Sequence, residues 1–118
     1  MNQMYDTYKD RVAFLIVYIM EAHPLEWDGT GGGKLPVPIA QHKTDEERHN
    51  AAQTCKAGLD LKLPFVVDRI DDKIGTVYGG RPDRIYIINK DGTIHYKGGK
   101  GPKGFKVGEA ETSLKQLL

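Results

Sequence analysis

Two residues that can exchange protons stand immediately after an apolar run near the start of the chain. The run at 12–19 is short and rich in Val, Ile, Phe and Tyr, and Glu21 and His23 follow it. An imidazole has a pKa near ~6.5 when unperturbed, so it can transfer a proton at neutral pH, and a carboxylate two residues away can orient it. The alternative is a pair that only caps backbone groups at the end of a strand. Catalysis would also need a nucleophile or a cofactor.

The side chains that could complete such a site are few. Cys55 is the single cysteine, which excludes an internal disulfide and a CxxC motif. It shares the apolar stripe of a predicted helix with Ala51 and Ala52, which favours a buried and unreactive thiol. His42 and His49 have neither an HExxH motif nor a cysteine partner, so no metal site is expected.

The elements that must position these residues can be predicted from periodicity and caps. The apolar run at 12–19 predicts a buried parallel strand, and open α/β sheets bind ligands at the carboxyl ends of such strands. Thr44 and Glu47 form a capping box that opens a helix, and Gly58 marks its end. Arg48 and Leu59 lie with Cys55 on the stripe expected to face the core.

The rest of the chain continues the α/β alternation. The spacing of apolar residues predicts helices over 1–10, 70–78 and 107–117, an edge strand over 63–68, and a hairpin whose strands are 85–89 and 93–97. The expected order is α-β-α-β-α-β-β-α. Alternation in the second hairpin strand places His95 on the face exposed to solvent.

Length and composition limit the possible functions. A chain of 118 residues predicts a single domain over 1–118. Its 17 basic and 16 acidic residues are well mixed, which argues against a nucleic-acid groove or a membrane-binding patch. The apolar run at 12–19 is far shorter than a membrane span, and the N-terminus does not have the pattern of a signal peptide. These features predict a cytoplasmic protein without nucleic-acid or membrane partners.

Five segments of the chain match one known family in order and in spacing. They are 14–19 with Glu21-Ala22-His23, then Ile39-Ala40-Gln41-His42 with Arg48 and Ala51-Ala52, then 64–68, then Pro82-Asp83-Arg84 with 85–88, and finally Tyr96-Lys97-Gly98 with Gly101-Pro102. In these segments the chain resembles the iodothyronine deiodinases and their bacterial deiodinase-like relatives.

The resemblance implies a thioredoxin-like α/β fold and an oxidoreductase. Such an enzyme uses a selenol or thiol to remove halide from a small aromatic substrate, and an external thiol reductant restores it without a bound cofactor. The resemblance also implies site residues: catalytic roles for Glu21 and His23, and substrate contacts for His42, Arg84, Trp27 and Pro82. Trp27 stands in Glu26-Trp27-Asp28-Gly29, where the family has Asp-Gly-Trp. Pro82 stands where thioredoxin-like proteins carry a cis-proline.

The resemblance further implies that two parts of the fold are missing. Family members carry a selenocysteine or cysteine in a strand–helix turn that would precede Met1. The chain is therefore expected to be a truncated selenoprotein or cysteine homologue, as arises when a UGA codon is taken as a stop, and to have no turnover by itself. It would lack the first, central strand, which lies between 12–19 and the hairpin and whose absence leaves strand edges unpaired. A shift of 12–19, a second copy in a homodimer, or residues outside this sequence would close that gap.

Two alternatives remain open at this point. The first is a peroxiredoxin-like thiol enzyme that reduces peroxide. The second is a non-catalytic redoxin-fold binding module, in which Glu21 and His23 have only a structural role.

Overall fold

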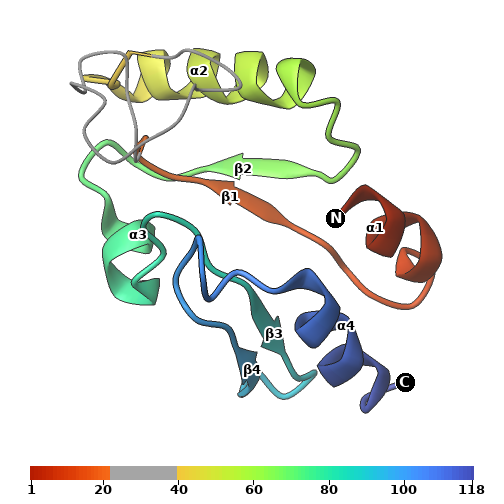
Figure 1. Cartoon of the computed structure of the whole chain (residues 1–118). Helices are drawn as coiled ribbons and strands as arrows, with labels where there is room; N and C mark the ends of the chain where they lie inside the picture. The colour runs from red at the N-terminus through yellow and green to blue at the C-terminus, as the bar shows by residue number, and fades with distance from the viewer. Residues whose placement is uncertain (22–39) are drawn as a thin grey trace.

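Helices and strands alternate along the chain in the order that the sequence predicts (Figure 1). The computed structural model describes residues 1–21 and 40–118. The elements in this part are α1 (Asn2–Tyr8), β1 (Ile16–Tyr18), α2 (Asp45–Gly58), β2 (Phe65–Val67), α3 (Lys73–Tyr78), β3 (Tyr86–Ile88), β4 (Ile94–Lys97) and α4 (Val107–Lys115). The mixed α/β class is therefore confirmed.

The strands β1 and β2 form a parallel pair that α2 covers on one face. The register runs from Ile16 opposite Phe65 to Tyr18 opposite Val67. Tyr18 packs with the small side chains of α2 in a core cluster whose other members are Ala51, Ala52, Cys55, Phe65 and Val67. The strand predicted over 12–19 is shorter in the structure. Its last residue, Tyr18, is buried beside α2.

The C-terminal half consists of a hairpin and the helix that covers it. Strands β3 and β4 are antiparallel, and Gly92 in the connecting turn has φ 91°, a left-handed conformation that glycine adopts without strain. Helix α4 packs on this hairpin and also meets α1, where Met4, Tyr8 and Leu114 form a second core cluster. Tyr8 also donates a hydrogen bond to Glu111 at 3.1 Å, which joins the two ends of the chain.

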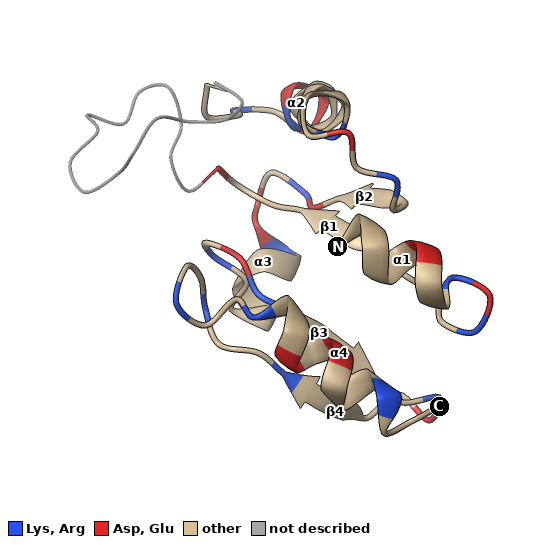
Figure 2. Ribbon diagram, turned by 45° about the vertical axis from the view of Figure 1, so that its right-hand side comes forward, with Lys and Arg blue, Asp and Glu red and all other residues tan. Residues whose placement is uncertain are grey.

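The two sheets do not join in the part of the chain that the structure describes. β1 pairs only with β2, and β3 pairs only with β4, within these residues. Both views show the hairpin set apart from the β1–β2 sheet (Figures 1 and 2). Next to the unpaired edge of β1, Leu15 and Val17 keep 59% and 38% of their surface exposed. A shift of residues 12–19 toward the hairpin, one of the three expected ways of closing the gap, is therefore not observed.

His95 corrects a sequence-based expectation. It was predicted on the solvent face of the hairpin, but it is half-buried, and its Nε2 lies 3.1 Å from the carbonyl oxygen of Ser113 in α4. The alternation of polar residues in β4 could not show this, because the face is covered by a helix that follows later in the chain.

The start of α2 follows the predicted capping box, except that Glu47 bonds to the residue before the N-cap. The Thr44 hydroxyl accepts a hydrogen bond from Glu47 N at 3.0 Å, and the Glu47 carboxylate accepts one from Lys43 N at 3.1 Å. The helix ends at Gly58 as expected. Leu59, which was predicted on the core stripe, is instead 43% exposed, because it lies just beyond the last helical residue.

Thr44→Ala tests this cap. The substitution removes the acceptor for an N–H group of the first turn, so we expect a loss of about 1 kcal/mol in the free energy of unfolding. Urea unfolding followed by circular dichroism measures it. Thr54→Ala, at an exposed position of the same helix, is the matched control and should change stability by less than about 0.5 kcal/mol. Equal losses in the two variants would contradict a role for the cap.

Candidate functional site

Glu21 lies just beyond the carboxyl end of β1, and its backbone is fixed by a side chain from the other side of the site. The Gln41 amide accepts a hydrogen bond from Glu21 N at 3.2 Å and donates one to Glu21 O at 3.0 Å. The Glu21 carboxylate accepts a hydrogen bond from the Tyr18 hydroxyl, three residues earlier on β1. Glu21 is therefore held in place by its main chain and by its side chain.

The Tyr18 hydroxyl connects Glu21 to His42. Tyr18 Oη lies 3.2 Å from His42 Nε2, and His42 Nε2 lies 4.0 Å from Glu21 Oε1. The His42 side chain is only 1% exposed, whereas that of Glu21 is 23% exposed. The three side chains therefore form a buried polar chain whose accessible end is the Glu21 carboxylate.

Arg48 continues this chain on the far side of His42. It is 2% exposed, and its Nε donates to His42 Nδ1 at 2.9 Å. Its Nη1 donates to Asp72 Oδ1 at 2.8 Å and to the carbonyl oxygen of Arg69 at 2.6 Å. A buried guanidinium needs such partners because an unpaired charge is costly to remove from water. We refer to Arg48, His42, Tyr18 and Glu21 together as the relay.

Burial and the neighbouring carboxylate change the acidity of two groups near the relay. Burial, and then the hydrogen bond to Glu21, raise the pKa of Tyr18 well above its usual range, so its hydroxyl keeps its proton at neutral pH. Burial, and then the negative charge of Glu21, raise the pKa of Cys55. A nucleophilic cysteine needs the opposite shift, so Cys55 is unsuited to that role.

The raised pKa of Tyr18 predicts a loss of stability in alkali. A tyrosine whose pKa is higher in the folded state stabilises that state below the unfolded pKa of about 10, and this contribution disappears as the pH rises above that value. We therefore expect the free energy of unfolding, measured in urea, to fall more steeply above about pH 10 in the wild type than in Tyr18→Phe. Identical slopes would show that Tyr18 does not hold its proton more tightly in the folded protein.

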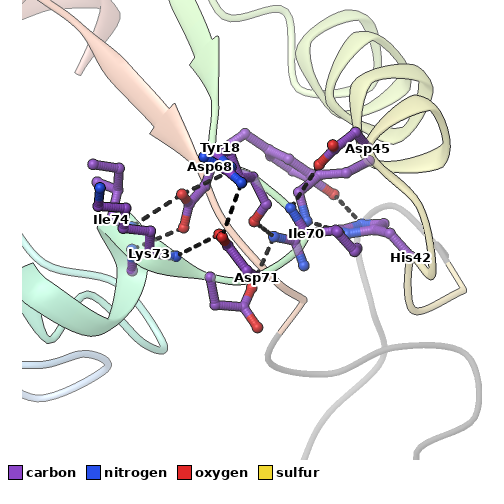
Figure 3. Close-up of polar contacts among 12 residues, drawn as sticks. Tyr18, His42, Asp45, Asp68, Ile70, Asp71, Lys73 and Ile74 are labelled. Carbon is purple, nitrogen blue, oxygen red and sulfur yellow. Dashed lines mark hydrogen bonds and ion pairs between the residues drawn. The ribbon is translucent and has the colours of Figure 1, made fainter.

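Asp68 holds together the segment on which Arg48 is anchored (Figure 3). This carboxylate, at the end of β2, is 3% exposed and accepts hydrogen bonds from the backbone N–H groups of Arg69, Ile74 and Gly75. Asp45, at the start of α2, accepts a further bond from Ile70 N at 2.6 Å. The loop between β2 and α3 is thereby fixed to the N-terminus of α2, close to His42.

A pocket of about 170 Å³ opens beside the same end of β1. Its lining combines apolar side chains from the end of β1, small residues of α3 and charged groups: Ile19, Met20, Asp72, Gly75, Thr76, Gly79, Arg81 and Lys100. Asp72 belongs both to the pocket wall and to the Arg48 ion pair. Asp72 therefore links the pocket to the relay.

The structure brings some of the predicted site residues together. Glu21 and His42 are joined through Tyr18. Pro82 follows the pocket residue Arg81 through a cis peptide bond, and Arg84 donates to the carbonyl oxygen of Gly79, another pocket residue, at 3.2 Å.

Two of the predicted site residues, His23 and Trp27, lie outside the described residues. Among residues 1–21 and 40–118, no group of three or more His, Cys, Asp or Glu side chains is arranged to hold a metal ion.

Three residues of the site were not predicted as functional. Tyr18 was assigned to the apolar strand, Arg48 to the core stripe of α2, and Asp72 to a short helix. For Arg48 a signal was present, because a charged side chain on an apolar stripe indicates a buried ion pair. The sequence contained no such signal for Asp72, since this residue is 24 positions from Arg48.

Comparison with known proteins assigns the chain to a family. The sequence profile described as "Iodothyronine deiodinase" matches residues 1–118. Bovine thyroxine 5-deiodinase is 39% identical to this chain over 109 residues, and the human thyroxine 5-deiodinase is 38% identical over 109 residues. The chicken thyroxine 5-deiodinase is 36% identical over 107 residues.

These alignments cover most of this chain but only part of each relative. They span 92%, 92% and 91% of this chain, and 35%, 34% and 40% of the bovine, human and chicken proteins. The chain thus spans roughly a third of the length of the curated relatives that it matches. No helix in residues 1–21 and 40–118 has the length and apolar character needed to cross a bilayer. With its profile match from end to end, the chain belongs to the iodothyronine deiodinase family.

Proposed function

We propose that this chain supplies the proton-relay part of a reductive dehalogenase that acts on iodinated aromatic compounds, with iodothyronines as the substrate class suggested by the names of its relatives. The observation that carries the proposal is the relay, which ends on a partly exposed Glu21 carboxylate at the carboxyl end of β1. Ligands of open α/β sheets bind at that edge. The pocket beside it has apolar walls at Ile19 and Met20, which suit an aromatic ring.

The proposed reaction needs a nucleophile, a proton and a reductant. A selenolate or thiolate bonds to the iodine as the aromatic C–I bond breaks, and the ring carbon takes up a proton in place of the iodine. Two external thiols then reduce the chalcogen–iodine bond, which releases iodide, forms a disulfide and restores the selenol or thiol. Within 1–118 the only thiol is Cys55, which is half-buried with a raised pKa, so we propose that the nucleophile lies outside these residues.

The relay fits the proton transfer in this reaction. Glu21 is the accessible end, and Tyr18 and His42 connect it to the buried Arg48. We propose that Glu21 and His23 exchange the proton with the reacting groups. We propose that His42, for which the family resemblance implies a substrate contact, also orients Tyr18 and Glu21.

Substrate contacts are proposed for the other side of the pocket. Arg84 and Pro82 adjoin the pocket residues Gly79 and Arg81, and Trp27 is proposed to contact the aromatic ring. A thioredoxin-like arrangement, with a further strand between β1 and β3, would bring a nucleophile to this edge. It is consistent with the unpaired edge of β1 and with family membership.

The proposal can be tested on the full-length protein. We expect it to release iodide from an iodothyronine in the presence of a dithiol, and we expect 1–118 alone to release none. An enzyme that reduces hydrogen peroxide but leaves the iodothyronine intact would instead support the peroxidase alternative. Neither activity, together with undiminished ligand binding after replacement of His23 and His42, would support a binding module.

A further inference from the structure

Arg48 determines the hydrogen position on His42. A guanidinium has N–H donors and no acceptor, so the 2.9 Å contact between Arg48 Nε and His42 Nδ1 requires Nδ1 to be the acceptor. The hydrogen of the neutral imidazole must then sit on Nε2, which faces Tyr18 Oη at 3.2 Å. A hydrogen on Nδ1 would point directly at the Arg48 N–H group.

We infer from this geometry that Arg48 is a positioning residue, which gives the relay a single direction by holding His42 in its Nε2–H tautomer. Each group then donates to the next: Arg48 to His42, His42 to Tyr18, and Tyr18 to Glu21. With its oxygen occupied by the His42 donor, the Tyr18 hydroxyl directs its own hydrogen to the Glu21 carboxylate. This inference deepens the proposed function and rests on it for its catalytic meaning.

The surroundings of Arg48 explain why it can hold this position. Its Nη1 is fixed by Asp72 Oδ1 and by the carbonyl oxygen of Arg69, so the planar guanidinium presents its Nε–H to His42 in one orientation. Asp72 also neutralises the buried charge. Its backbone has φ 59°, an uncommon conformation for a residue other than glycine, and Asp72 N donates to the same Arg69 carbonyl at 2.9 Å.

The two ends of the relay have different functions. Arg48 is buried behind His42, so it acts on the reacting groups only through it, whereas the half-buried Asp72 anchors Arg48 and also lines the pocket. Glu21, at the accessible end, is the group that can exchange a proton with a ligand. His42 thus keeps its hydrogen on Nε2 and orients the Tyr18 hydroxyl, because its Nδ1 accepts from Arg48.

Nitrogen NMR of the imidazole tests this assignment without any turnover. In full-length protein labelled with ¹⁵N, the His42 signals are those absent from His42→Gln. We expect the pattern of the Nε2–H tautomer in the wild type, with two well-separated ring nitrogens. The Nδ1–H pattern, or an even mixture of the two tautomers, would overturn the inference.

Variants of Arg48 test whether this residue causes His42 to adopt the Nε2–H tautomer. Arg48→Met keeps a long side chain but removes the donor, so we expect loss of the single tautomer and a lower kcat with little change in KM. Arg48→Lys, which can still donate a hydrogen bond to His42, should restore part of the Nε2–H tautomer population and part of kcat. Arg69→Gln is the matched control: its side chain is exposed and does not touch His42, and its carbonyl remains. A wild-type tautomer pattern in a folded Arg48→Met variant would contradict the inference.

Asp72→Asn covers the case in which Arg48→Met does not fold. It leaves Arg48 in place but weakens its anchor, and we expect a measurable Nδ1–H population. An unchanged His42 pattern would show that Asp72 does not position Arg48.

A failure of the proposed function would give a different result from a failure of this inference. If His42 is in the Nε2–H tautomer but Glu21→Gln retains full dehalogenation activity, the positioning role of Arg48 is supported and the proposed catalytic role of the relay is contradicted.

Discussion

Glu21→Gln is expected to lower kcat for dehalogenation by the full-length protein by about 10²- to 10⁴-fold, which is the usual contribution of a positioned acid–base group. The amide still accepts the Tyr18 hydrogen bond through its oxygen, so the fold and the pocket should be retained. The glutamine amide cannot take up or release a proton at neutral pH. KM should change little, because the pocket residues Ile19 and Met20 are untouched.

Steady-state kinetics with an iodothyronine and a dithiol measure this effect. Tyr18→Phe should lower kcat in the same direction, because it interrupts the relay between His42 and Glu21. Glu46→Gln is the matched control, since this carboxylate is exposed on the first turn of α2, away from the relay. A Glu21→Gln enzyme with wild-type kcat would show that the proton in the rate-limiting step comes from elsewhere.

Asp68→Ala is expected to cost about 3 kcal/mol of unfolding free energy. The carboxylate accepts three backbone hydrogen bonds in a buried setting, and its removal leaves N–H donors of Arg69, Ile74 and Gly75 without their acceptor. Hydrogen bonds to a charged group contribute about 1.5–3 kcal/mol, and an unsatisfied buried donor costs a further 1–3 kcal/mol. Some of the loss will be recovered where water reaches the start of α3.

Urea unfolding of Asp68→Ala and Asp68→Asn measures this contribution. The asparagine keeps one acceptor oxygen, so its loss should be smaller. Asp71→Ala is the control from the same loop: Asp71 is exposed, accepts one bond from Lys73 N at 3.2 Å and pairs with the exposed Arg69. Asp71→Ala should lower the free energy of unfolding by less than about 1 kcal/mol. Similar losses for Asp68→Ala and Asp71→Ala would show that the buried carboxylate does not hold the loop.

Local patterns predicted the succession of elements because their causes lie within a few residues. The cap at Thr44, the end of the helix predicted over 70–78 and the turn between strands 85–89 and 93–97 each involve neighbours in sequence, and all three were correctly placed. Boundaries were less accurate. The strand predicted over 12–19 is confined to Ile16–Tyr18, since only these residues have a ladder partner in β2.

The site was only partly predictable for the same reason. Glu21 could be identified from its place after a strand, and His42 from the family resemblance. Their connection through Tyr18 depends on α2 lying against β1, and the anchoring of Arg48 depends on the loop before α3 reaching the same helix.

The sequence alone determined the α/β succession, the cap that opens α2 and the family, because these depend on residue type and short-range spacing. Only the tertiary structure showed that Arg48 is a buried partner of His42 and that Asp72 joins the relay to the pocket. A hydrogen-bond network forms where distant segments are packed together, and its direction follows from which atoms meet. That information is absent from any local stretch of residues.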